Sequence, residues 1–159
     1  DVQRRLARTA VGARREALAG LLAAGCLALL VCLLALLTPW LFGAIDKSSE
    51  PVGGTVLGVL AHLLTVPPAL AVGALAARAV TRTVRNGVTV LVVAAVLVVV
   101  LGLRGSIAPW LVPPVMAMAR ALSAEALPAP GTVGLLAGWT ALWCAVAFTG
   151  YAWLRRARS

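Results

Sequence analysis

The chain has 159 residues, of which 62% are hydrophobic and 12% charged, and its mean hydropathy is +1.00. No segment is long and polar enough to fold as a water-soluble domain, so we expect one all-α integral membrane domain over residues 1–159, without an aqueous catalytic unit. The formal net charge of +9 comes from short basic groups beside apolar segments rather than from a basic face interleaved with aromatics, so no nucleic-acid partner is predicted.

Residues 1–16 have the pattern of an amphipathic helix. Apolar residues recur at spacings of three and four, and arginines occupy much of the remaining surface. Leu6 and Ala13 lie on the apolar side, and Arg8 is one of the arginines. We expect this helix to lie along the inner membrane interface or to dock on a partner.

Four apolar stretches follow, at about residues 17–44, 56–80, 88–103 and 133–154. A helix needs about 20 apolar residues to cross a bilayer, so the pattern predicts four transmembrane helices. The third stretch has only 16 residues, about 24 Å of helix, and we expect it to extend toward Val84 and Gly105 or to thin the bilayer locally.

The charges predict the orientation of these spans. Eleven of the 14 Lys and Arg residues lie before the first span, between the second and third spans, or after the fourth span. The positive-inside rule places those segments in the cytoplasm, so both termini are expected there. The segments on the other side carry Lys47, Arg104 and Arg120, which Asp46, Glu50 and Glu125 balance.

The second span contains three residues that are unusual inside a membrane. Pro67 and Pro68 remove ladder hydrogen bonds, so we expect a kink or a break there. Broken helices border substrate paths in some transporters, but they also occur in passive spans. For His62 we favour an interhelical hydrogen bond or contact with interfacial water over a role as a proton relay.

The segment between the third and fourth spans is rich in proline and too polar to cross the membrane. Pro109, Pro113 and Pro114 lead into residues 115–127, which carry Arg120 and Glu125. We expect one or two short helices, a hairpin that dips into the outer leaflet.

The fourth span contains a GxxxG pair, Gly134 and Gly138, which permits close approach of another helix. Trp139 and Trp143 lie four residues apart on a neighbouring face. Tyr151 and Trp153 suit the inner interface, just before the terminal arginines.

No residue set points to enzyme chemistry, so we predict no catalytic residue, no cofactor and no metal ion. Cys26, Cys32 and Cys144 all lie in apolar spans, at spacings that match neither a redox pair nor a zinc site. The sequence has no nucleotide-binding GxxxxGK[ST] motif. Because the spans hold no Asp, Glu, Lys or Arg at mid-depth, transport coupled to protons or sodium is also disfavoured.

The second half of the chain resembles the C-terminal end of ABC-2 type exporter permeases. The resemblance rests on the helix-loop-helix from Gly58 through Ala74 to Arg78–Arg85, on the Pro-rich outer hairpin, and on Gly134–Trp139 running into Tyr151–Arg156. It implies short outer-leaflet helices before the last span and a basic cytoplasmic helix that docks on an ATPase, a role that residues 1–16 would fill. Members of that family have six spans, so the resemblance implies that two spans precede Asp1.

Two functions remain open at this point. One is a permease subunit of an ATP-driven exporter in the bacterial cytoplasmic membrane, which carries a lipophilic or amphipathic substrate and works with an ATP-binding subunit and a second permease half. Its coupling residues would include Leu6, Arg8 and Ala13, and its substrate path would pass Pro67, Pro68 and Trp139. The other is an accessory subunit that contacts lipid and other membrane subunits and stabilises a larger complex.

Overall fold

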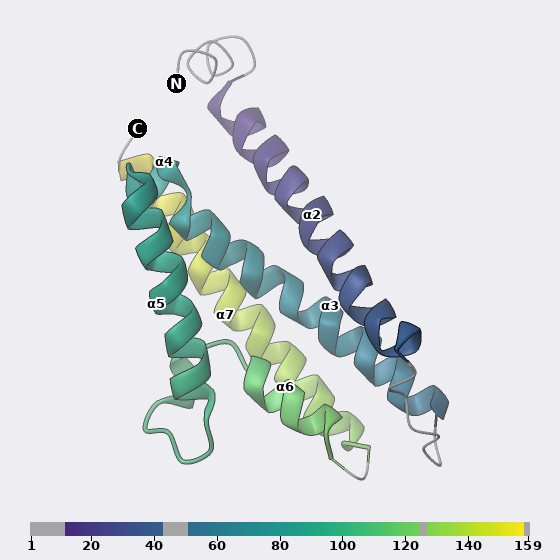
Figure 1. Ribbon diagram of the computed structural model, residues 1–159. Helices are drawn as coiled ribbons and strands as arrows, with labels where there is room; N and C mark the ends of the chain where they lie inside the picture. Colours follow the sequence, from purple (N-terminus) through teal and green to yellow (C-terminus); the bar gives the residue numbers. More distant parts are fainter. Residues whose placement is uncertain (1–11, 43–50, 125–126, 158–159) are drawn as a thin grey trace.

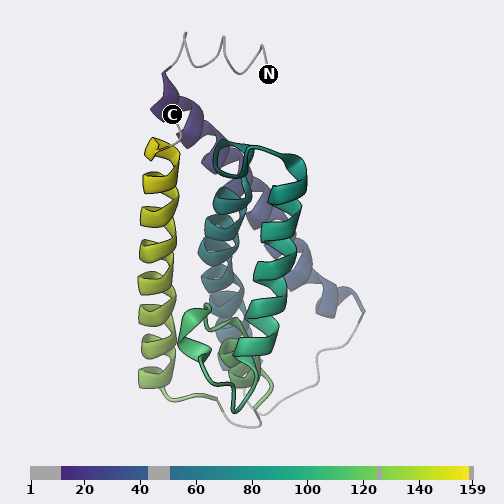
Figure 2. The ribbon, with the colours of Figure 1, turned by 90° about the vertical axis from the view of Figure 1, so that its left-hand side faces the viewer.

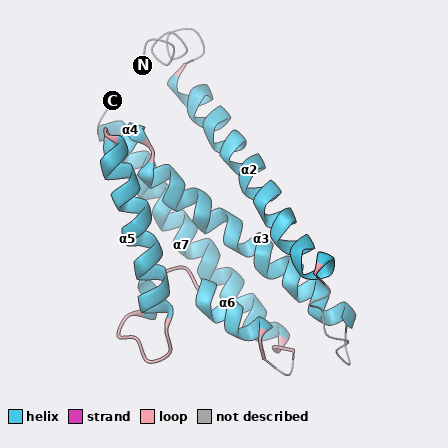
Figure 3. Ribbon diagram, viewed as in Figure 1, coloured by secondary structure: helices cyan, strands magenta, loops and turns pink. Residues whose placement is uncertain are grey.

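The computed structural model describes residues 12–42, 51–124 and 127–157, and these residues form helices and loops without a strand (Figure 3). The four long helices are α2 (Ala13–Leu41), α3 (Pro51–Ala76), α5 (Val84–Gly102) and α7 (Pro130–Ala157). Three short elements connect them: α4 (Arg78–Thr81), the 3₁₀ helix η1 (Pro109–Leu111) and α6 (Val115–Leu122). All four long helices are long and apolar enough to cross a membrane, which confirms the predicted number of spans.

Helix α3 lies at the centre of the bundle, where it packs against α2, α4, α5, α6 and α7 (Figures 1 and 2). Small side chains let the neighbouring helices approach it closely: Ala61, Ala71 and Ala74 are all buried, and Ala71 is 0% exposed. On α7, the buried residues Thr140, Cys144 and Ala147 are spaced by four and three and therefore share one face. Most larger apolar side chains point outward, as expected for helices surrounded by lipid.

Pro67 and Pro68 do not break α3, contrary to one of the two expected outcomes. Hydrogen-bonded helix continues through both prolines to Ala76. The prolines remove the amide donors for the carbonyls of Leu63 and Leu64, but the turns on either side keep their bonds. The interruption falls later, at Ala77, where the backbone becomes extended before α4 begins.

The turn between α3 and α5 is held by side-chain hydrogen bonds. The Thr81 hydroxyl lies 3.2 Å from the carbonyl oxygens of Ala76, Ala77 and Thr83, and it can donate to one of them at a time. Thr83 caps α5 by accepting from the Asn86 amide at 3.2 Å, and the Asn86 side chain donates to the Thr81 carbonyl at 3.3 Å. These bonds fix the position of α4 and therefore the position from which the Arg78 side chain extends.

At the opposite end, η1 and α6 lie between the third and fourth long helices, in the segment where one or two short helices were expected. Two side chains fasten them to the long helices. Arg120 Nη1 donates to the carbonyl of Gly102 at the end of α5, at 2.8 Å, and Trp143 Nε1 on α7 donates to the carbonyl of Leu111, at 2.9 Å. Arg120 thereby satisfies a carbonyl that the end of a helix leaves unpaired.

The first long helix begins earlier in the chain than the sequence-based prediction. Residues 1–11, with Leu6 and Arg8, lie outside the described part of the chain. Ala13 is already the first residue of α2, so residues 13–16 belong to the spanning helix and not to a separate amphipathic one. Gly12, with φ +83°, precedes it in a conformation that L-residues rarely adopt, whereas Ala13–Glu16 are good helix formers.

The start of α2 and the end of α7 lie at the same end of the bundle as α4, and η1 and α6 lie at the other (Figure 1). This arrangement follows from four antiparallel crossings. It places all the described members of the eleven-residue basic set at one end.

At Gly87, α5 packs so closely against the end of α3 that there is no room for a side chain. A Cβ added there would lie 2.6 Å from the carbonyl oxygen of Ala76, which is backbone and cannot rotate away. We expect Gly87→Ala to destabilise the protein by about 1–3 kcal/mol, the usual cost of overpacking. Gly150→Ala, with nothing within 4 Å of the added atom, is the control and should be neutral or stabilising. Unfolding titrations in mixed detergent measure both, and equal effects would contradict the α3–α5 contact.

The orientation can be tested with single cysteines in a chain whose three native cysteines are replaced by alanine. Ile107→Cys, at a residue 95% exposed in the loop near η1, should react with a membrane-impermeant maleimide applied to intact cells. Arg85→Cys, at the start of α5, should react only after the membrane is opened. The reverse pattern would overturn the predicted cytoplasmic termini.

Candidate functional site: an apolar groove between two helices

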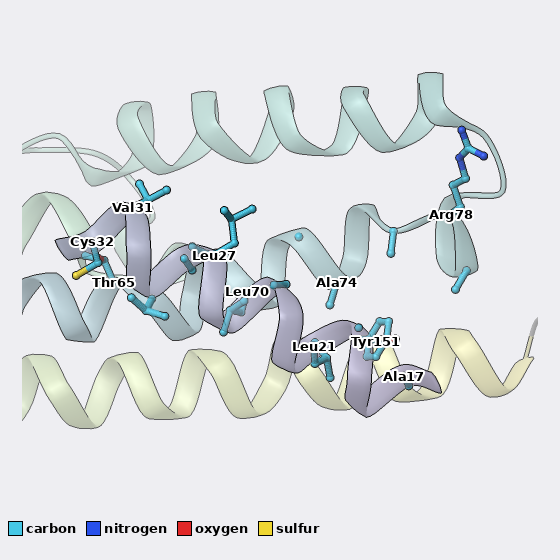
Figure 4. Close-up of a pocket in the computed structure, with 18 of the residues that line it drawn as sticks. Ala17, Leu21, Leu27, Val31, Cys32, Thr65, Leu70, Ala74, Arg78 and Tyr151 are labelled. Atoms are coloured by element: carbon cyan, nitrogen blue, oxygen red, sulfur yellow. The ribbon is translucent and has the colours of Figure 1, made fainter. Parts of the chain in front are cut away.

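A groove of about 760 Å³ lies between α2 and α3 and is bordered at one end by α4 and α7 (Figure 4). Its volume lies within the range of roughly 300–1,000 Å³ that is usual for ligand pockets. Its long walls are apolar and include Leu21, Leu27, Val31, Leu70 and Ala74.

The groove exists because α2 has one main packing partner. α2 packs against α3, and no comparable contact with α5 or α7 is present among the described residues. The two helices lie close at the end where α2 finishes and separate toward the end where α2 begins (Figure 1). With 29 residues, α2 is about 43 Å long and exceeds the hydrocarbon thickness of about 30 Å, so its length permits the inclination to α3 that Figure 1 shows.

Charged and polar side chains surround the wide end of the groove, which we call the mouth. Glu16 on α2 and Arg155 on α7 form an ion pair at 3.7 Å across it. Arg155 Nη1 also donates to the hydroxyl of Tyr151 at 3.3 Å. Arg78 lines the mouth from α4, and its exposed side chain extends away from Tyr151 in Figure 4. The Arg78 side chain makes no hydrogen bond or ion pair with the other described residues.

The other end of the groove is also polar and contains His62, Thr65 and Cys32. His62 Nδ1 lies 2.8 Å from the carbonyl oxygen of Gly58, one turn earlier in the same helix. Because a carbonyl only accepts, Nδ1 carries the proton, and in the neutral ring Nε2 is left as an acceptor. The Thr65 hydroxyl donates to the carbonyl of His62 at 2.7 Å. Among the described residues, the His62 ring thus bonds only within α3; contact with interfacial water, the other role expected for it, stays a prediction.

The residues predicted for a substrate path do not meet in this groove. Pro67 is exposed, Pro68 is buried and Trp139 is half-buried, and none of the three lines the groove. Their neighbours Val66 and Ala69 line it instead. Of the predicted coupling residues, Ala13 begins α2 one turn before the mouth, and Leu6 and Arg8 lie outside the described residues.

The mouth was not identified from the sequence. From the sequence, Tyr151 is expected at a membrane interface and Arg155 with the terminal arginines, and no role is predicted for Glu16. A usable signal was present: Glu16 and Asp1 are the only acidic residues within the inner basic groups. A carboxylate beside a spanning helix and facing several arginines predicts an ion pair between helices.

Gly134 and Gly138 do not pack closely against another helix within the described chain. Both are exposed, and an added Cβ would meet nothing within 4 Å at either position. The described residues also contain no cluster of three or more His, Cys, Asp or Glu side chains that could hold a metal ion.

Comparison with known proteins adds no assignment: no protein-family model, no curated protein and no solved structure matches this chain.

The bond from His62 to its own helix leads to a prediction about stability. His62→Leu removes a polar side chain that joins no second helix, so the free energy of unfolding should change by less than about 1 kcal/mol. Thr140→Val tests a buried hydroxyl that likewise bonds within its helix, to Leu136 at 2.8 Å, and is the matched control. A loss of several kcal/mol for His62→Leu alone would show that the ring bonds another helix in the membrane.

Proposed function

We propose that this chain is the membrane-spanning permease subunit of an ATP-driven exporter in the bacterial cytoplasmic membrane, and that the α2–α3 groove is the path of a lipophilic or amphipathic substrate. The observation that carries the proposal is the groove itself. It is large, apolar along its length and polar at both ends. This distribution suits a molecule with a long apolar part and a polar group.

The chemistry of the groove favours an external source of energy. Between its mouth and His62, the lining residues include no Asp, Glu, Lys or Arg. Coupling to an ion gradient normally requires such a group inside the membrane. The chain also lacks a nucleotide-binding motif of its own, so ATP hydrolysis belongs to a separate subunit.

The position of α2 suggests how that subunit acts on the groove. Ala13 starts α2 directly after Gly12, and Glu16 one turn later stands at the mouth. A force applied to residues 1–11 by an ATPase would therefore reach the wall of the groove through one continuous helix. Because α3 is the main helix that holds α2, α2 can move relative to α3 without unpacking α5, α6 and α7.

A second function is favoured by a different observation, the exposed face of α7. Small residues form a stripe along it: Gly131, Gly134, Gly138, Ala141, Ala145 and Ala152 are all exposed. Such a stripe permits close packing of another transmembrane helix. It suits an accessory subunit in a larger complex, and it equally suits a second permease half.

Purification of the native complex in mild detergent distinguishes the two functions. A permease should copurify with a stoichiometric ATPase that carries a Walker motif, and mass spectrometry of its own N-terminus should find further spans upstream of Asp1. Copurification with other membrane subunits alone, from a chain that starts at Asp1, would contradict the permease and favour the accessory subunit.

Variants of the coupling segment provide the functional test. Leu6→Asp together with Arg8→Glu should lower substrate-stimulated ATP hydrolysis in proteoliposomes by at least tenfold, because the pair reverses the charge and the polarity of the proposed docking face. Gly150→Ala is the control, since an added Cβ meets nothing within 4 Å there and the residue lies outside the coupling segment. Normal ATP hydrolysis by a correctly inserted Leu6→Asp, Arg8→Glu protein would contradict the assigned coupling role.

A further inference from the structure

We infer that the groove binds an anionic lipid of the inner leaflet, with the headgroup phosphate at Arg155 and Arg78 and one acyl chain along α2 and α3. The inference deepens the proposed function, on which it rests for the role of the groove as a substrate path. The binding itself is tested without ATP.

The dimensions of the groove fit an acyl chain that enters from one membrane face. From Ala76 at the mouth to His62, α3 rises about 21 Å at 1.5 Å per residue, whereas one leaflet contributes about 15 Å of hydrocarbon. A chain in the groove therefore reaches past the membrane centre. Leu21, Leu27, Val31 and Leu70 contact it along the way, and their side chains lie along the groove in Figure 4.

The charge at the mouth selects the headgroup. Two arginines and one carboxylate line it, which leaves one net positive charge where the predicted topology places the inner interface. Guanidinium groups bind phosphate oxygens through two parallel hydrogen bonds, and basic pockets between transmembrane helices recognise anionic headgroups. Tyr151 supplies a further hydroxyl donor beside Arg155. The Arg78 side chain, which extends away from Tyr151, reaches the same phosphate after rotating toward the groove.

Glu16 gives this site a distinctive property, because it competes with the lipid. Its carboxylate lies 3.7 Å from Arg155, on the group that the phosphate must engage. A zwitterionic lipid gains little by displacing Glu16, since its own cation offsets the phosphate. An anionic lipid replaces one anion by another at Arg155. Removing the negative charge of Glu16 should therefore strengthen anionic lipid binding, whereas removing either arginine should weaken it.

The test uses the full chain in nanodiscs of phosphatidylcholine with a trace of photoreactive lipid. The probes are phosphatidylglycerol and phosphatidylcholine, each with a diazirine at the end of one acyl chain. Phosphatidylglycerol should crosslink preferentially to peptides that contain Cys32 and Thr65, where the end of the chain is expected. Crosslinks spread evenly over the lipid-facing surface of α5 and α7, or equal yields from the two lipids, would overturn the inference.

Matched charge variants separate a specific site from general attraction. Arg78→Gln and Arg155→Gln should each lower the phosphatidylglycerol crosslink by roughly fivefold, which corresponds to about 1 kcal/mol for one arginine near the membrane surface. Arg85→Gln removes the same charge from the same end of the bundle, at a residue that does not line the groove, and should change little. Glu16→Gln should raise the yield, an effect that misfolding cannot mimic.

The outcomes distinguish this inference from the proposed function. Selective crosslinking with the predicted order of variants, in a chain without an associated ATPase, would support the lipid site and reject the exporter. An active ATPase complex whose crosslinks respond equally to Arg78→Gln, Arg85→Gln and Arg155→Gln would retain the exporter and reject the lipid site.

Discussion

Close packing around α3 is the constraint on which the rest of this structure depends. Lipid tails are as apolar as the side chains that face them, so burial of apolar surface does little to hold transmembrane helices together. Helices adhere where small residues let their backbones approach. Ala61, Ala71 and Ala74 provide such surfaces on α3, and Gly87 lets α5 approach the carbonyl of Ala76. All the other described α-helices gather around this one.

The groove forms because α2 packs mainly against α3, whereas the other long helices are held by several contacts. α5, α6 and α7 are tied to each other or to α3 by the turn between α3 and α5 at one end of the bundle and by Arg120 and Trp143 at the other. α2 has α3 and, at the mouth, a long ion pair that solvent and headgroups can screen. Among the described residues, the wall of the candidate site is thus the long helix with the fewest helix partners. That difference makes it suited to open and close while the remainder keeps its shape.

Much of the fold could be predicted from the sequence because the signals are local. The length of an apolar run defines a span, and proline with polar residues marks the short helices between Arg104 and Gly131. Helix boundaries were less predictable, since polar first and last turns such as Ala13–Glu16 continue the hydrogen-bonding pattern beyond the apolar run. The sequence also did not determine whether α3 continues through Pro67 and Pro68, because a proline inside a helix can either kink the helix or end it.

The candidate site was predicted less well, for a physical reason. A groove is defined by the angle between two helices, and hydropathy carries no information about that angle. Pro67, Pro68 and Trp139 are conspicuous in the sequence, yet the groove is built largely from alanine, glycine, leucine and valine that differ little from the rest of the chain. Glu16, Tyr151 and Arg155 become recognisable as a group only when α2 and α7 are brought to the same end of the bundle.

The central position of α3 also sets an order for biosynthesis. Of the described helices, α2 leaves the ribosome before α3, so its main packing partner has not yet been made. Because α2 is apolar on nearly every side, it is stable in lipid before α3 is inserted. When α3 follows, the two can associate, but α3 still exposes the faces meant for α5 and α7. Among these contacts, the one between α3 and α7 closes last, because the ends of these helices near α4, at Ala76 and Tyr151, are separated by most of the second half of the chain. A chain that stops before α7 therefore retains an open face on its central helix, the surface by which a membrane quality-control protease could recognise it as incomplete.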